Sequence, residues 1–231
     1  MDASAATNRA RDGCGNTATV NSVTQIRDLL FGDLPLDAWP SDEKLSGEPW
    51  ARFVSARLHK EGGDSDAARK SLYQILAMKD LESRHYLQAW HFLRSLGDEP
   101  DNSGLKHLYG VVVEVALDKG VDIVAAYEDY SVRYYNYSGS GIVWEHPNNS
   151  LNVAIDKLLN AGRAILERIG PWKGERPPAP ERGEVRINLL TPSGLHFGQG
   201  PYDVLSEDLM GGPMIAAAFR LMQSLIEQQT G

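Results

Sequence analysis

The sequence predicts an α+β fold: an N-terminal helical segment followed by a mostly antiparallel sheet, built from a four-strand meander plus a hairpin, with two covering helices. Apolar residues recur every three or four positions from Pro49 to Gly97, as they do in amphipathic helices. From Leu108 onward they alternate at every second position, as they do in half-buried strands. The chain has 231 residues, 42% of them hydrophobic, and is therefore long enough to bury a core.

Three regions are expected along the chain. Residues 1–20 are expected to form a disordered tail, because they contain almost no large apolar side chain that could dock. Residues 21–105 form the helical segment, and residues 106–231 form the antiparallel sheet and its two helices, packed with the helical segment as one unit. The single cysteine, Cys14, lies in the tail and has no second cysteine for an internal disulfide.

The helical segment is expected to open with a short helix. Val23, Ile26 and Leu30 recur at helical spacing, and Gly32 follows them as a stop. The stretch 34–40 then contains two prolines, which prevent a continued helix. This stretch is expected to be a packed connector anchored by Leu36 and Trp39.

Three amphipathic helices are expected between residues 49 and 97, separated near Gly62 and near Asp80. Small and aromatic residues punctuate this stretch, at Pro49-Trp50, Gly63-Asp64-Ser65-Asp66-Ala67, Ala89-Trp90, Leu96-Gly97 and Pro100. The punctuation resembles that of a tetratricopeptide repeat, whose period is about 34 residues. The resemblance covers about a fifth of the chain and implies protein binding. A plain helical bundle is the alternative interpretation.

A four-strand meander is expected to follow the helical segment. A β-branched run with a period of two predicts the first strand, from Tyr109 to Leu117. Shorter runs with turn residues between them predict three more strands, at 121–127, 131–137 and 142–145. Apolar residues at helical spacing from Leu151 to Ile169 then predict a helix that covers the sheet.

The last part of the chain is expected to add a hairpin and a second covering helix. The proline-rich stretch 171–180 predicts an extended strap. Alternating residues at 185–189 and 195–197 predict two strands, and a turn is expected at 198–200. The final helix is expected to start near Pro213. Its predicted core-facing residues are Met214, Ala218, Leu221, Met222, Leu225 and Ile226.

The alternation along the strands predicts a candidate binding site on the sheet. If the valines of the first strand face the covering helices, Glu114 faces the opposite side of the sheet. In the last strand, Leu195 and Phe197 are expected to face the core, which leaves His196 on the polar side. The polar face then collects Glu114, Arg133, Tyr135, Arg186, Asn188 and His196. Guanidinium groups suit carboxylates or phosphates, and an ordinary solvated face is the alternative interpretation.

Several classes of protein are excluded or disfavoured. No apolar run approaches the roughly 18 residues that cross a bilayer, and the first residues lack the apolar stretch of a signal peptide, so no membrane partner and a cytoplasmic location are expected. A net charge of -8 opposes binding to nucleic acid. No familiar catalytic motif is present, and the lone cysteine and the spacing of His85 and His91 indicate no metal site. No cofactor is therefore expected.

Three functions stay open on these observations. The first is a non-enzymatic protein-binding or adaptor protein, whose partner is another protein. The second is a small-molecule sensor or binding module that uses the polar face for an anionic ligand. The third is an enzyme, with His196 as base and Arg133 or Arg186 holding an anionic substrate. A deep concavity lined by these three side chains would favour the second or third, and a flat apolar patch on the helices would favour the first.

Overall fold

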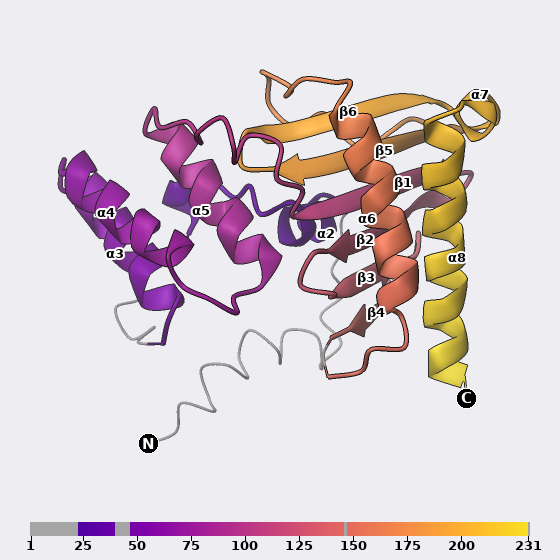
Figure 1. The fold of residues 1–231 in the computed structure, drawn as a ribbon, viewed down its shortest axis with the longest axis horizontal. Helices are drawn as coiled ribbons and strands as arrows, with labels where there is room; N and C mark the ends of the chain where they lie inside the picture. Colours follow the sequence, from indigo (N-terminus) through magenta and orange to yellow (C-terminus); the bar gives the residue numbers. More distant parts are fainter. Residues whose placement is uncertain (1–22, 40–46, 146, 231) are drawn as a thin grey trace.

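The computed structural model describes residues 23–39, 47–145 and 147–230. It has the predicted α+β fold, with helices first and an antiparallel sheet after them (Figure 1). The predicted tail, with Cys14, lies outside the described residues. None of the helices in the described ranges is both long enough and apolar enough to cross a membrane.

The described helices are α2 (Val23–Phe31), α3 (Trp50–Glu61), α4 (Ser65–Leu76), α5 (Ser83–Ser95), α6 (Asn152–Leu166), α7 (Tyr202–Glu207) and α8 (Gly211–Thr230), with a 3-10 turn at Leu36–Ala38. The strands are β1 (Gly110–Leu117), β2 (Gly120–Tyr127), β3 (Val132–Tyr135), β4 (Gly141–Trp144), β5 (Glu184–Thr191) and β6 (Gly194–Pro201).

The sheet has the strand order β4-β3-β2-β1-β5-β6, and each neighbouring pair is antiparallel. The meander pairs strands in sequence order, and the β5–β6 hairpin joins the other edge of β1. This places β1 in the interior of the sheet, where Val113 lies opposite Val124 on one side and Ile187 on the other. The four-residue β4 and the glycine-containing β6 form the two outer edges.

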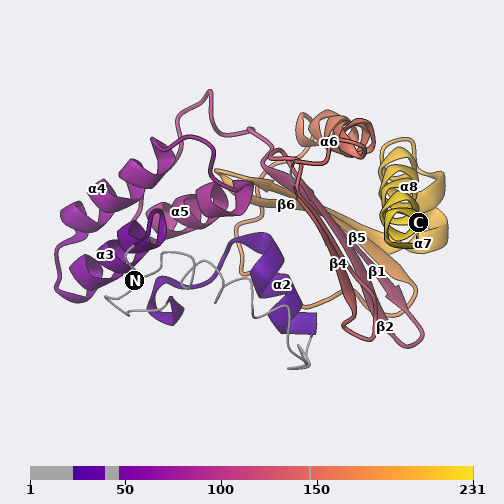
Figure 2. The same ribbon diagram turned by 90° about the horizontal axis from the view of Figure 1, so that it is seen from below.

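One face of the sheet is covered by α6 and α8, as predicted (Figure 2). The predicted valine series of β1 faces these helices, and Val111 and Val113 are buried under them. Gly162 lets α6 approach the sheet closely, since a Cβ atom at this position would lie 3.0 Å from Leu108 and 3.1 Å from Leu189. This face holds the largest group of buried apolar side chains in the described residues.

The opposite face of the sheet is covered by α2 (Figure 2). Ile26, Leu30 and Phe31 of this helix belong to one buried cluster with Val112 and Ile123 of the sheet. The strap over residues 171–180 has no helix or strand, in agreement with its prolines, and its backbone contacts both α2 and β5. Around Glu114 and Arg186 the polar face of the sheet therefore lies beneath α2 and the strap and is not open to solvent.

The helical segment α3–α5 has a separate cluster of buried apolar side chains beside the sheet (Figure 1). Asp64 begins α4, since its side chain accepts a hydrogen bond from the backbone N–H of Ala67. The connector packs as predicted: Leu36 and Trp39 are buried, and Trp39 stacks on Trp50 with ring centroids 5.6 Å apart. The resemblance to a tetratricopeptide repeat stays a prediction.

The structure differs from the predictions near the C-terminus. Residues 198–200 continue β6 instead of forming a turn, because they pair with β5 as far as Pro201. The short helix α7 follows β6 directly and was not predicted, since its six residues are too few for a helical period to be recognised. The last helix begins at Gly211, two residues before the expected proline.

Candidate functional site

The centre of the predicted polar face is a buried cluster of charges around Glu114. This carboxylate is fully buried, with its Oε1 atom 2.6 Å from Nε of Arg27 in α2. Its Oε2 atom accepts a hydrogen bond from the Asn188 amide at 3.0 Å and lies 3.7 Å from Nη1 of Arg186. Three of the six predicted residues, Glu114, Arg186 and Asn188, therefore meet, together with an arginine that the prediction did not include.

The strap completes this cluster with backbone carbonyl groups. Arg186 donates a hydrogen bond of 2.6 Å to the carbonyl of Pro178, and Arg27 donates one of 2.8 Å to the carbonyl of Pro177. The Nε atom of Arg186 also donates to the Gln199 side chain at 2.7 Å. Burial lowers the pKa of Arg186 from its ordinary value, although a guanidinium group stays charged at any physiological pH. The charged groups of the cluster are therefore bound by groups of its own chain.

Tyr135 and Arg133 share this face but lie away from Glu114. Tyr135 is separated from Glu114 by Ile123 in the same cross-strand row. Arg133 lies in another row, three strands from Asn188. Its guanidinium group donates to the carbonyl of Trp144 at 3.1 Å and contacts the Glu145 carboxylate at 2.5 Å. Arg133 and Arg186 therefore cannot hold one small anion between them.

His196 was predicted on the polar face, and this placement is wrong. His196 lies directly opposite Leu189, so its side chain faces α6 and α8. The reason is the two-residue turn at Pro192-Ser193: Thr191 pairs with Gly194, and residues 189 and 196 must share a face. Leu195 and Phe197 are on the polar side instead, where Trp172 of the strap packs against Phe197 with ring centroids 5.4 Å apart.

The environment of His196 is that of a structural residue in a strand, next to the turn at Pro192-Ser193. Its Nε2 atom lies 3.1 Å from the Ser193 hydroxyl, a pairing that nucleophilic enzymes also use. The Ser193 hydroxyl, however, donates a 2.7 Å hydrogen bond to the carbonyl of Leu105 and so fixes the turn. Burial is the main cause of the lowered pKa of His196, against which the backbone carbonyls of Ile169 and Gly170 act.

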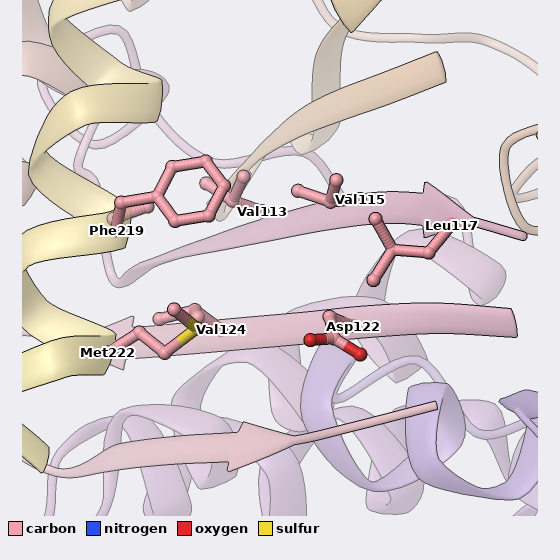
Figure 3. A pocket seen from close by; sticks show the side chains of 8 residues that line it. Val113, Val115, Leu117, Asp122, Val124, Phe219 and Met222 are labelled. Atoms are coloured by element: carbon pink, nitrogen blue, oxygen red, sulfur yellow. The ribbon is translucent and has the colours of Figure 1, made fainter. Parts of the chain in front are cut away.

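The structure contains an apolar groove that the sequence reasoning missed. It lies on the other face of the sheet, beside α8, and Figure 3 shows its lining. Valines of β1 and β2 form the floor, side chains of α8 form one wall, and Leu117 and Asp122 lie at the end near the β1–β2 turn. The lining residues are Val113, Val115, Leu117, Asp122, Val124, Ala218, Phe219 and Met222.

The hydrophobic pattern of the sequence does not indicate this groove. Met222 and Ile226 were predicted to face the core, yet Met222 is half-buried along the groove and Ile226 is exposed. Leu117, at the end of β1, is 45% exposed. A helical stripe identifies the side of α8 that faces the sheet, but it does not reveal where the sheet extends past the helix.

The one charged group in the groove is held by its neighbours. Asp122 accepts hydrogen bonds from the Tyr134 hydroxyl at 3.0 Å and from the backbone N–H of Tyr137 at 2.8 Å. Burial, with the hydrogen bond and charge of Asp122, raises the pKa of Tyr134 to about 12. The groove is thus an apolar recess with a carboxylate at one end, suited to an apolar side chain.

The described residues contain no group of three or more His, Cys, Asp or Glu side chains arranged to hold a metal ion. Comparisons of the chain with protein-family models, with curated proteins and with solved structures found no match.

Proposed function

We propose that the chain is a non-enzymatic binding or adaptor protein, and that its apolar groove receives an apolar side chain of a partner protein. The observation that carries this proposal is the partly exposed lining beside α8: Leu117 is 45% exposed, and Phe219 and Met222 are only half-buried, although each is large and apolar. Fully burying an exposed side chain of this size contributes about 1.5–3 kcal/mol, and covering the part of these side chains that is still exposed contributes a share of that, which suits an interface anchor.

The alternatives have less support. An anionic ligand on the polar face would have to displace α2 and the strap, because both contact Glu114 or Arg186 directly. An enzyme that uses His196 with Arg133 or Arg186 would need side chains that lie on opposite faces of the sheet. A small apolar molecule in the groove remains the second candidate, since apolar lining with one polar group is typical of ligand sites.

A photo-crosslinking amino acid at position 117 tests the proposal in the protein's own host. We expect it to capture a protein that the same amino acid at position 143 does not capture. Val143 is a matched control: it is 42% exposed, also lies in a strand, and its side chain is on the opposite face.

The captured protein is then purified and titrated against the parent and two variants. Leu117→Asp places a charge in the groove and should weaken binding at least about tenfold, whereas Val143→Asp should leave it unchanged. Equal affinities for the parent and Leu117→Asp would contradict the proposal. Native mass spectrometry that finds a bound small molecule, lost only in Leu117→Asp, would favour the second candidate instead.

A further inference from the structure

The outer surface of the α6–α8 layer carries a second groove, unlike the first because it is basic. Small side chains of both helices line it, which leaves a recess between them. The lining residues are Ser150, Leu151, Val153, Ala154, Lys157, Ala161, Pro213, Ala217, Arg220 and Ser224. Lys157 and Arg220 are exposed on either side, and neither forms an ion pair with another described residue. The groove therefore has two free positive charges on a protein whose net charge is -8.

The corner between α7 and α8 has the opposite character. Leu209 is 93% exposed and Val204 is 60% exposed, so two large apolar side chains project into solvent. Three carboxylates lie next to them in the sequence, at positions 203, 207 and 208, and no Lys or Arg occurs between residues 202 and 219. The corner is an apolar knob with a net charge of -3.

The corner is also held in one conformation. The Asp208 carboxylate accepts hydrogen bonds from the backbone N–H groups of Met210 and Gly211, at 2.8 and 2.7 Å. A Cβ atom at Gly211 or Gly212 would lie 2.8 or 2.6 Å from a backbone carbonyl oxygen of α7, so only glycine fits at these two positions. A fixed knob loses little conformational entropy when it binds, which favours a role in recognition.

We propose that a second copy of this chain docks its α7–α8 corner into the basic α6–α8 groove, and that the contact is reciprocal. Leu209 enters the recess lined by small side chains, and the neighbouring carboxylates approach Lys157 and Arg220. Every copy carries both surfaces, so one twofold arrangement satisfies two contacts at once. Packing the two basic grooves directly against each other is disfavoured, because it would bring four like charges together.

Sedimentation velocity over a range of concentrations tests this assembly. We expect the parent to change from monomer to dimer with a dissociation constant on the order of 10 μM, and to return toward monomer as salt screens the charges. A parent protein that stays monomeric up to about 100 μM overturns the proposal.

Two variants locate the contact on the two surfaces. Leu209→Asp should abolish dimers, and so should the double substitution Lys157→Glu with Arg220→Glu. All three positions are exposed, so both variants should keep the circular dichroism and melting temperature of the parent. Controls at exposed positions of the helical segment, Leu58→Asp and Lys60→Glu with Lys70→Glu, should dimerise as the parent does.

Mixing the two defective variants gives the sharpest result. Each is monomeric alone, but the Leu209→Asp protein keeps its groove and the double variant keeps its corner. An equimolar mixture should therefore form a heterodimer through one intact contact, with weaker affinity than the parent dimer. A mixture that forms no heterodimer even at about a hundredfold the dissociation constant of the parent, while the parent dimerises, would show that dimers use other surfaces, and would overturn the proposal. This outcome is independent of the apolar groove and of its partner.

Discussion

The Nε atom of Arg27 lies 2.6 Å from the Oε1 atom of Glu114, although 87 residues separate the two in sequence. Both side chains are almost fully buried, and Glu114 also receives the amide of Asn188. Removing two charges from water costs several kcal/mol for each, which close pairing and additional hydrogen bonds must offset. The pair therefore fixes where α2 lies on the sheet.

Replacing Glu114 by Gln should destabilise the protein strongly. Gln keeps the shape, but it replaces one accepting oxygen with a donating NH2 group that would face Arg27 or Asn188, and it leaves Arg27 and Arg186 buried without a counter-charge. We expect a loss of about 3–5 kcal/mol in the free energy of unfolding, measured by urea denaturation. Glu61→Gln, which removes an exposed pair with Arg57, is the control and should change the midpoint little. Similar midpoints for both variants would mean that the buried pair contributes no specific stability.

His91 should make the protein sensitive to acid. Burial, with the nearby charges of Arg94 and Arg176, lowers its pKa to about 4 from an ordinary value of 6.5. Between pH 6.5 and 4 the unfolded chain therefore binds a proton that the folded chain does not, and the free energy of unfolding falls as the pH falls.

The variant His91→Gln checks this pH dependence. It should reduce the slope between pH 6.5 and 4, by at most about 1.4 kcal/mol per pH unit, and His59→Gln on the exposed end of α3 should not. His85 and His196 also have lowered pKa values, so part of the slope should remain. An unchanged slope in His91→Gln would show that this histidine titrates alike in both states.

Gly162 should tolerate no large side chain. Gly162→Leu would push α6 away from Leu108, Leu189 and Val111, which lie within 3.1 Å of the position of its Cβ atom. We expect a loss of about 1–3 kcal/mol, read as a lower urea midpoint. Ala164→Leu, on the exposed side of the same helix, is the control and should be nearly neutral. Gly162→Ala should fall between them, because better helix propensity offsets part of the crowding.

The helical segment and the sheet should unfold together. Arg94 of α5 donates a hydrogen bond of 2.5 Å to the carbonyl of Pro192, and Arg176 of the strap pairs with Asp28 in α2 and with Asp33 just after it. These contacts connect the helical segment, residues 21–105, with the sheet region, residues 106–231. Calorimetry should therefore give one transition, and two separated transitions would show two independent domains.

The fold was more predictable than the site, for a physical reason. Burial dictates the period of each helix and strand, and the phases of Glu114, Arg186 and Asn188 follow from the valines beside them. What covers a face depends on contacts between distant residues, such as Arg27 with Glu114, which no local pattern encodes. The face of His196 follows from the two-residue turn before it, which fixes the register whatever the hydrophobicity of Leu195 and Phe197.

The strand order has a consequence for how the chain is made. β1 can pair with β2 soon after both leave the ribosome, but its other edge waits until β5 has been synthesised. At about 5–20 residues per second, the valine-rich edge of β1 stays unpaired for several seconds while α6 and the strap are added. During that interval a newly made chain exposes the kind of edge on which strands from other chains assemble. Aggregation during synthesis should therefore be greatest for chains that stall between β4 and β5.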